Sequence, residues 1–447
     1  MPIPVDSIID AAWALPIAPE NRAFADYSVA IAEARIVAFG PRTEVHDAYR
    51  ADAHIACEHG VLLPGLVNAH GHAAMTLLRG VADDPPLERW LNERIWPLES
   101  RHMSAEFVAD GTNLAIAEML KSGTTCFSDM YFHPEVAARC AHEANVRAQI
   151  CFPIVRFRNA WSVSSADAFR KGLAVVDAFR NDPLVRIGFG PHSVYAVDRE
   201  DLLKIATLAE EVDAAIQIHL HETAAEVRAG RAEYGMSPLM LLDQLRFLSP
   251  RVQAVHLTTA TAEELDRLAH AGAGVVHCPQ SNLKLGSGLC SIARLNERGI
   301  RWALGTDGAA SNNGLDLLQE ARVALLLARM LTIDQAEDPV VPDALSVLRA
   351  ATLGGAHLLG LADEIGSIEP GKCADLVLVD FDDPAYVPVH SPESQLVFTS
   401  AGTRVTHVWV NGRLVVADRE LKTLDETDVK ARAHAWARRM RATGRAG

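Results

Sequence analysis

The chain has 447 residues, of which 49% are hydrophobic, so it can bury a sizeable core and form one large domain with a smaller one, or two or three domains of ordinary size. The formal net charge is −15, and Lys and Arg form no dense cluster, which argues against nucleic acid as a partner. The seven cysteines are scattered without a C-x-x-C pair, so we expect reduced thiols in a cytoplasmic protein rather than a disulfide framework or a thiolate zinc site.

The sequence predicts no membrane segment. Its first twenty residues contain acidic residues and prolines, where a signal peptide needs a basic start and an uninterrupted apolar run. No later run predicts a spanning helix. We therefore expect no membrane partner.

The predicted elements begin with strands. Residues 27–41, "YSVAIAEARIVAFGP", alternate apolar and polar positions, which is typical of strands. From about residue 60 to residue 307, short β-rich runs alternate with longer stretches of helical period, which indicates repeated βα units. The predicted strands of this region are 61–72, 124–130, 147–154, 185–192, 215–222, 252–258, 273–281 and 301–307.

Helix signals lie between these runs. In "SAEFVADGTNLAIAEMLKSG", Ser104 can cap the start of a helix and Gly123 can end it. In "TAEELDRLAHAG", Thr261 can cap, and Glu263 and Glu264 fall in the first turn, where the helix dipole favours negative charge. We expect these helices in the outer ring of a barrel.

Strand patterns return near the end of the chain. Residues 366–380 and 405–420 alternate again, and Asn411–Gly412 in the second stretch is a hairpin turn signal. Together with the strands before the barrel, they predict a small β-sandwich domain built from both termini.

The predicted fold is thus α/β, with a (β/α)8 TIM-like barrel beside the small domain. We expect the barrel to span residues 64–364, and the small domain to combine residues 1–63 with residues 365–447.

Polar residues follow most of the predicted barrel strands. The active site of a (β/α)8 barrel lies where strands end and βα loops begin. The residues at these positions are His70, His72, Asp129, His192, His219, Glu222, His256, His277 and Asp307. Histidine at the ends of five strands indicates a metal-dependent active site.

Four of these residues form a candidate ligand set. His70 and His72 are two apart on a strand, so both side chains can face one ion, although an H-x-H pair alone is a weak signal. With His219 and Asp307 they give three imidazoles and a carboxylate, which suit zinc or ferrous iron and leave a position for water.

The run "HLHE" contains two histidines. His219 and His221 would share a face if the strand continued, but an H-x-x-E spacing lets Glu222 also reach the site where the strand gives way to a loop. We therefore assign His219 as the ligand and Glu222 as the acid/base, and take His221 as a residue that packs or supports a ligand.

These residue types predict hydrolysis. A metal held by imidazoles and a carboxylate lowers the pKa of its water and makes a hydroxide nucleophile. Asp307 can accept the proton of that water, and Glu222 can carry protons to a ring nitrogen and a departing amine. His256 would polarise or orient the water.

Six motifs carry a resemblance to a known family. They are "PGLVNAHGHAAMTLLRG", "WLNERIWPLE", "GFGPHSVY", "HLHET", "VHCPQSNLKLGSG" and "LGTDGAASNN". The chain resembles the amidohydrolase superfamily and, within it, the 5-methylthioadenosine/S-adenosylhomocysteine deaminases, from about Asp6 to Val416. The H-x-H pair and the terminal Asp mark only the superfamily, whereas the "AAMTLLRG", "IWPLE" and "SNLKLGSG" runs together are specific.

The resemblance implies further substrate-binding residues. Glu99, in "IWPLE", matches the carboxylate that holds the ribose hydroxyls, and His192 matches a substrate-contacting histidine. An arginine of the third βα loop contacts substrate in such enzymes, and here Arg156 and Arg158 are both candidates. The fourth strand ends in His192 rather than a bridging lysine, so one divalent metal is expected in each subunit, zinc before ferrous iron.

The predicted function is zinc-dependent deamination of adenosine-type nucleosides by metal-hydroxide attack at purine C6. The products are the inosine derivative and ammonia. The alternative within the superfamily is an aminohydrolase acting on guanine, an oxidised purine or a chloro-triazine, and such substrates have no diol for Glu99. A catalytically silent scaffold barrel is disfavoured, because such proteins lose metal ligands, whereas this sequence contains all four candidate ligands together with Glu222 and His256. We expect a homo-oligomer, dimer or tetramer.

Overall fold

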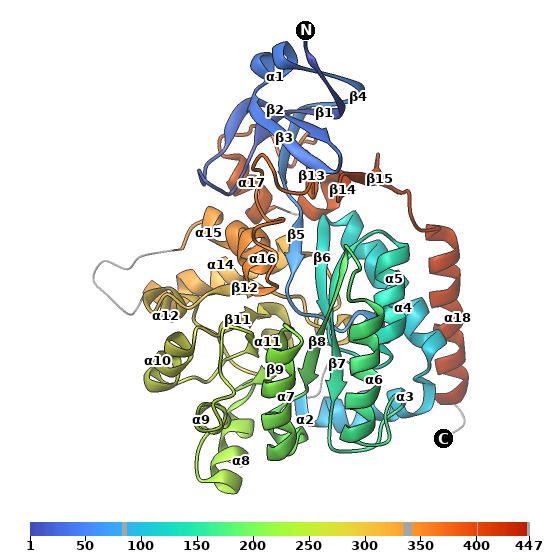
Figure 1. The fold of residues 1–447 in the computed structure, drawn as a ribbon, viewed down its shortest axis with the longest axis vertical. Coiled ribbons are helices and arrows are strands. Elements are labelled where there is room, and N and C mark those ends of the chain that lie inside the picture. Colours follow the sequence, from blue (N-terminus) through green and yellow to red (C-terminus); the bar gives the residue numbers. More distant parts are fainter. Residues whose placement is uncertain (83–86, 334–341, 400, 445–447) are drawn as a thin grey trace. The chain divides into compact units, whose positions relative to one another are not determined.

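The computed structural model describes residues 1–82, 87–333, 342–399 and 401–444, which form two eight-stranded sheets. The parallel sheet has the order β12-β11-β10-β9-β8-β7-β6-β5, so consecutive strands are neighbours (Figure 1). Its strands are β5 (Leu66–Asn68), β6 (Thr124–Asp129), β7 (Arg147–Ile154), β8 (Val185–Pro191), β9 (Ile216–Leu220), β10 (Val252–His256), β11 (Gly274–His277) and β12 (Trp302–Leu304).

The two ends of this sheet meet. Directly after β5, the Ala69 N–H donates to the carbonyl of Leu304 in β12 at 2.9 Å. All eight predicted strands are present, and the predicted (β/α)8 barrel is confirmed.

The first predicted strand is divided. Within 61–72, residues up to Pro64 end β4 of the other sheet, and β5 begins only at Leu66. Gly65 lies between them, and a Cβ there would lie 2.0 Å from Oγ1 of Thr125. A single apolar run in the sequence therefore supplies two strands, which turn at a point where only glycine fits.

Helices connect the barrel strands. Between barrel strands lie α4 (Ala105–Lys121), α5 (Pro134–Glu143), α6 (Ser165–Ala178), α7 (Arg199–Glu211), α8 (Ala224–Tyr234), α9 (Pro238–Gln244) and α10 (Ala262–Ala271). Two further long helices follow the last barrel strand, α14 (Leu317–Ile333) and, at the end of the element order, α18 (Glu426–Gly444). The Ser104 hydroxyl accepts the Phe107 N–H before α4, and Gly123, with φ 94°, follows that helix. Thr261 and Glu264 form a capping box at α10. These predicted helix ends are confirmed.

Shorter helices complete the chain. They are α1 (Arg42–Ala48), η1 (Ala73–Leu78), α2 (Leu87–Trp90), η2 (Leu91–Ile95), α3 (Trp96–His102), η3 (Val194–Ala196), α11 (Pro279–Lys284), α12 (Ile292–Glu297), α13 (Ala309–Asn312), α15 (Ala344–Arg349), η4 (Ala350–Gly354), α16 (Gly355–Leu358), α17 (Pro392–Phe398) and η5 (Ala401–Arg404).

The second sheet combines strands from both ends of the chain. Its order is β16-β15-β14-β13-β4-β1-β2-β3. The strands are β1 (Ile3–Ala14), β2 (Phe24–Ala32), β3 (Arg35–Pro41), β4 (Tyr49–Pro64), β13 (Leu376–Asp380), β14 (Val405–Val410), β15 (Arg413–Ala417) and β16 (Glu420–Leu421). Asn411 and Gly412, with φ of 51° and 74°, make the predicted tight turn between β14 and β15.

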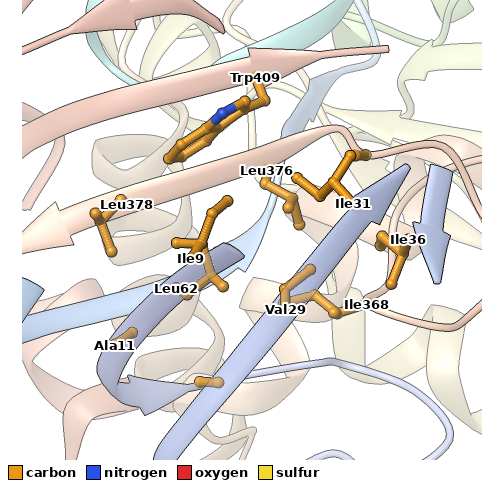
Figure 2. Close-up of a cluster of buried hydrophobic side chains, with 12 residues drawn as sticks. Ile9, Ala11, Val29, Ile31, Ile36, Leu62, Ile368, Leu376, Leu378 and Trp409 are labelled. Carbon is orange, nitrogen blue, oxygen red and sulfur yellow. The ribbon is translucent and has the colours of Figure 1, made fainter. Parts of the chain in front are cut away.

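A buried apolar cluster lies between the two halves of this sheet (Figure 2). Ile9 and Val29 come from the N-terminal strands, and Leu376 and Trp409 from the C-terminal strands. The edge strand β3 also reaches the segment before β13, since the Ile36 N–H donates to the Lys372 carbonyl at 2.9 Å. The predicted small β-sandwich from both termini is therefore confirmed, as one sheet that folds over its own core.

Packing divides the chain into two compact units. One contains residues 1–68, 117–126 and 316–424, and the other contains residues 69–116, 127–315 and 425–447. The boundary runs through strand β6, so these units are not the barrel and the small domain themselves. The predicted domain limits, 1–63 with 365–447 and 64–364, stay a prediction. In the part of the chain that the structure describes, no helix has the length and apolar character needed to cross a bilayer.

Candidate metal centre and active site

The predicted ligands meet at the carboxyl ends of β5, β9 and β12. His70, His72 and His219 each offer a nitrogen, and these atoms all lie within 4.8 Å of one another. The Nε2 atoms of His70 and His219 are 3.3 Å apart. Oδ1 of Asp307 lies 3.5 Å from Nε2 of His70 and 3.3 Å from Nε2 of His72. The structure thus brings together all four residues that the sequence singles out as ligands.

The other ring nitrogen of each histidine contacts an oxygen acceptor. These Nδ1 contacts are His70 to Oε1 of Gln217 at 2.7 Å, His72 to the Met130 carbonyl at 2.7 Å, and His219 to the His192 carbonyl at 2.8 Å. Each Nδ1 therefore carries the proton, and each Nε2 presents a lone pair to the centre. Lone pairs and a carboxylate converging on one point repel one another unless a cation or a proton lies among them. The donor set of three nitrogens and one oxygen fits zinc.

Gln217 fixes the tautomer of His70. Its Nε2 donates to the Ala69 carbonyl at 3.0 Å and to Oε1 of Gln253 at 2.8 Å. A backbone carbonyl can only accept, so the amide group of Gln217 can have only one orientation, with Oε1 toward His70. A buried glutamine two residues before His219 on β9 therefore controls which nitrogen of His70 faces the centre.

The backbone is strained where the strands end. His221, His256 and Asp307 have φ values of 53°, 76° and 58°, in the left-handed region that non-glycine residues rarely adopt. Such strain gathers at functional sites, where the surrounding structure holds it in place. In this protein the left-handed backbone conformation sets the direction of the His221, His256 and Asp307 side chains at the strand ends.

Glu222 lies beside the centre as a buried acid. Burial, reinforced by the charge of Asp307, raises the pKa of Glu222 to about 8. The Ser287 hydroxyl donates to its Oε1 at 3.3 Å. The carboxylate of Glu226 accepts the backbone N–H groups of His221 at 3.1 Å and Glu222 at 2.7 Å, which secures the turn that carries Glu222.

His256 faces Glu222. Its Nε2 lies 3.8 Å from Oε2 of Glu222, and its Nδ1 lies 2.9 Å from Oδ1 of Asn282. Burial lowers the pKa of His256, so the ring is neutral at neutral pH and donates to Asn282. Its Nε2 lone pair is then available on the Glu222 side.

His221 behaves as a packing residue. It is fully buried, and its Nε2 accepts the Leu239 N–H at 3.2 Å. Its Nδ1 lies 3.9 Å from Oε2 of Glu264. This placement supports the choice of His219 over His221 as the ligand.

A cavity of about 700 Å³ opens onto the centre. Its lining includes the predicted residues His72, Glu99, Arg156, Arg158, His192, His219, Glu222, His256 and Asp307. Much of the remaining wall is apolar, with Trp90, Leu91, Ile95 and Phe132 among its residues. This combination of apolar wall and a few convergent polar groups is typical of a small-molecule site.

Glu99 lies in this cavity on α3 with its carboxylate mostly buried. It is 8% exposed, and the Tyr131 hydroxyl donates to its Oε1 at 2.5 Å. Burial raises the pKa of Glu99 to about 7, against the opposing hydrogen bond from Tyr131. A buried carboxylate held by one donor retains acceptor positions for a ligand.

His192, Arg156 and Arg158 also border the cavity. His192 is neutral, because burial and the neighbouring histidines lower its pKa to about 4. Arg156 is half exposed, and its Nη1 is 3.9 Å from Oδ1 of Asp198. Both arginines line the cavity, so the choice between them stays open.

Several supporting residues have no role in the sequence prediction. Gln217 shares a strand face with His219, and the period of two along "IQIHL" is a signal that could have found it. Asn282 and Ser287 lie within "SNLKLGSG", and Ser281 there donates to Oδ2 of Asp307 at 2.6 Å. Tyr131 follows β6, and no pattern in the neighbouring sequence indicates that it contacts Glu99.

Comparison with known proteins identifies the family of the chain. The model of the amidohydrolase family matches residues 61–415. A 5-methylthioadenosine/S-adenosylhomocysteine deaminase of Teredinibacter turnerae is 46% identical over 436 residues, which cover 98% of each chain. A 5'-deoxyadenosine deaminase of Methanothermobacter thermautotrophicus is 40% identical over 389 residues, 87% of this chain and 89% of that protein.

A solved structure is also closely similar. The crystal structure of an adenosine deaminase from Xanthomonas campestris with bound zinc superposes with a TM-score of 0.96 and is 42% identical, covering 99% of this chain and 100% of that one. The fold and the sequence similarity, which extends over nearly the full length of the chain, both agree with the family match. The chain belongs to the amidohydrolase family and, within it, to the 5-methylthioadenosine/S-adenosylhomocysteine deaminases.

Proposed function

We propose that this enzyme hydrolytically deaminates adenosine-type nucleosides, among them 5-methylthioadenosine, S-adenosylhomocysteine and adenosine, to the inosine derivative and ammonia. The relatives named for these activities match nearly the whole chain, and the cavity combines a metal centre with a buried carboxylate suited to a diol. One divalent metal, zinc before ferrous iron, would be held in each subunit by His70, His72, His219 and Asp307.

When bound, the metal acts as a Lewis acid that activates water for attack at C6 of the purine. Glu222 is the proton donor to the ring nitrogen, since burial keeps its carboxyl protonated near neutral pH. Asp307 accepts one proton from the attacking water. Glu222, deprotonated by the first transfer, takes the second proton of that water from the new C6 hydroxyl and delivers it to the departing amine, so that ammonia leaves. The proton held by Asp307 then returns to Glu222 and restores its carboxyl for the next turnover. His256 orients the water through its Nε2.

The observation that carries the nucleoside assignment is Glu99. Its carboxylate shares one cavity with Glu222 and the ligands, and the Tyr131 hydroxyl holds it by a hydrogen bond to one oxygen. Two ribose hydroxyls can donate to such a carboxylate, whereas free bases and triazines have none. His192, with Arg156 or Arg158, would contact the substrate on other sides.

A substrate panel tests the function. Zinc-loaded protein should convert 5-methylthioadenosine, S-adenosylhomocysteine, 5'-deoxyadenosine and adenosine, followed at the absorbance change from adenosine to inosine. Free adenine and guanine should not react. Turnover of guanine in preference to every nucleoside would contradict the assignment.

A Glu99→Gln variant tests the ribose contact. Losing a charge-assisted hydrogen bond costs about 1.5–3 kcal/mol, so kcat/KM for adenosine substrates should fall roughly 10–100-fold. Glu93→Gln is the matched control, because Glu93 is exposed and pairs with Arg89. An unchanged kcat/KM in Glu99→Gln would favour a nucleobase or triazine substrate.

We also infer a homo-oligomer, dimer or tetramer, in the cytoplasm. Leu326 and Met330, one turn apart on α14, are 45% and 73% exposed, which supports a contact between subunits. All seven cysteines are free thiols, which supports a reducing compartment. Light scattering that gave a monomer mass would contradict the oligomer.

A further inference from the structure

A second cluster of metal-ligating side chains lies in the terminal sheet. Asp10 on β1, His46 on α1 and His54 on β4 offer ligand atoms that all lie within 4.8 Å of one another. Three separate elements converge here, and all three residues belong to the same compact unit.

The carboxylate of Asp10 is the fixed point of this cluster. Asp10 is only 2% exposed, and the Ser28 hydroxyl donates to its Oδ1 at 2.5 Å. Nε2 of His46 lies 3.0 Å from Oδ1 and 3.1 Å from Oδ2, and Nε2 of His54 lies 2.6 Å from Oδ2. Both imidazoles therefore point the same nitrogen at one buried carboxylate.

The two rings differ from the active-site histidines in one respect. In the active site, oxygen acceptors fix the Nδ1 protons, whereas among the described residues neither His46 nor His54 has a hydrogen-bond partner at Nδ1. Their side chains are 39% and 47% exposed, so water reaches them. Each ring can therefore carry its proton on Nδ1 toward water and present the Nε2 lone pair to an ion.

We propose that Asp10, His46 and His54 bind a second divalent transition-metal ion, distinct from the catalytic one, with water completing its coordination. Two imidazoles and a carboxylate suit zinc, copper or nickel, and they disfavour magnesium and calcium, which prefer oxygen donors. The exposed rings leave room for the water ligands.

The geometry needs only a small adjustment. Ligand atoms around tetrahedral zinc are about 3.3 Å apart for bonds near 2.0 Å, so the 2.6 Å contact of His54 must lengthen by less than about 1 Å. Half-exposed rings can swing outward, while Asp10 stays in place. Although burial opposes it, the hydrogen bonds from Ser28, His54 and His46 hold the pKa of Asp10 below its usual value, so the carboxylate is ionised and ready to bind.

Zinc stoichiometry tests the site. Holoenzyme is dialysed against buffered micromolar free Zn²⁺, and zinc per chain is measured by atomic emission. The wild type should hold two ions, and a His46→Ala/His54→Ala variant should hold one. Wild type that held one ion, or a double variant that kept two, would overturn the site, the latter by showing an adventitious ion elsewhere.

A matched control uses a lone histidine–carboxylate pair. Nδ1 of His142 lies 2.7 Å from Oδ2 of Asp182, with its side chain 54% exposed, so His142→Ala removes a similar ring without a second imidazole. This variant should still hold two zinc ions. Loss of the second ion in this variant would count against the assignment.

Thermal unfolding provides a second readout and guards against misfolding. An ion that bridges β1, α1 and β4 binds only the folded state, so excess Zn²⁺ should raise the Tm of the holoenzyme. Asp10→Asn, which keeps the shape of the side chain, should lose this increase while retaining deaminase activity. An equal zinc-induced increase in Asp10→Asn and wild type would contradict the proposal.

Discussion

At the scale of single residues, Gln217 is predicted to strengthen metal binding through His70. Gln217→Met keeps the volume of the side chain but removes the acceptor of the His70 Nδ1 proton. Outer hydrogen bonds to ligands are worth about 10–100-fold in metal affinity, so zinc affinity measured by chelator competition should fall by that factor. Gln149→Met is the control, because Gln149 bonds to Gln253 in the same buried network. Equal affinities in the two variants would contradict this role.

Glu226 is expected to position Glu222 without touching substrate. Its carboxylate accepts two backbone N–H groups in the turn that carries Glu222, and a glutamine amide at this position can match only part of this arrangement. Glu226→Gln should therefore lower kcat by roughly 10-fold or more, the loss of about one such hydrogen bond, while zinc content stays at the wild-type level.

The control for Glu226 is another first-turn acid of a barrel helix. Glu200 lies in the first turn of α7 and is exposed, so Glu200→Gln should leave kcat unchanged. A Glu226→Gln enzyme that lost zinc together with kcat would point instead to general disruption of the strand end.

At the scale of elements, α10 shows how one cap can serve two helices. The Thr261 hydroxyl accepts the Glu264 N–H, and the Glu264 carboxylate accepts the Thr261 N–H at 2.7 Å. The same carboxylate accepts the hydroxyl of Ser237, the residue that caps α9, at 2.5 Å. Two consecutive helices are thereby joined at their N-termini.

Thr261→Ala should destabilise this pair. Removing a capping hydroxyl costs about 1 kcal/mol, which denaturant unfolding can measure. Thr261→Ser keeps the hydroxyl and should retain most of the stability. A Thr261→Ala protein as stable as the wild type would show that the cap contributes nothing measurable here.

At the scale of the whole molecule, buried acids make the stability of the metal-free protein depend on pH. Burial raises the pKa of Glu222 to about 8, and of Glu99 and Glu226 to about 7, from 4.5. The folded state therefore binds more protons than the unfolded state between these values, and stability falls as the pH rises through the window. Asp307 raises the pKa of His72 to about 9 despite burial. The loss of stability with rising pH therefore continues up to about pH 9.

Histidines oppose this trend only at lower pH. Burial lowers the pKa of His192 to about 4 and of His277 to about 3, so their contribution to stability grows with rising pH and is complete above 6.5. Above pH 6.5 the buried acids and His72 set the slope, and the Tm of chelator-treated protein should decline toward pH 8.5.

Glu222→Gln isolates one group in this pH dependence. This substitution should reduce the difference in bound protons between the folded and unfolded states by at most one. One proton corresponds to about 1.4 kcal/mol of unfolding free energy per pH unit, so the Tm of the variant should fall less steeply with pH. The exposed Glu93→Gln should leave the slope as it is. A wild-type Tm that rose from pH 6.5 to 8.5 would contradict the raised pKa values.

Local sequence patterns are enough to predict the barrel strands, several helix caps and the residues at the strand ends. A strand's period of two, a capping residue and a glycine are each read within a few neighbours, so no tertiary contact is needed to recognise them. The convergence of His70, His72, His219 and Asp307 was predictable because the ends of parallel strands meet at one edge in such a fold.

The tertiary structure decided what depends on contacts between distant residues. Gln217 sets the His70 tautomer across 147 positions of the chain, and Tyr131 holds Glu99 across 32. The division of one apolar run at Gly65 likewise depends on Thr125. The amino-acid sequence is enough to predict which residues can bind a metal, because their chemistry and spacing are local. The tertiary structure determined which atoms face the ion, because hydrogen bonds between separate strands orient them.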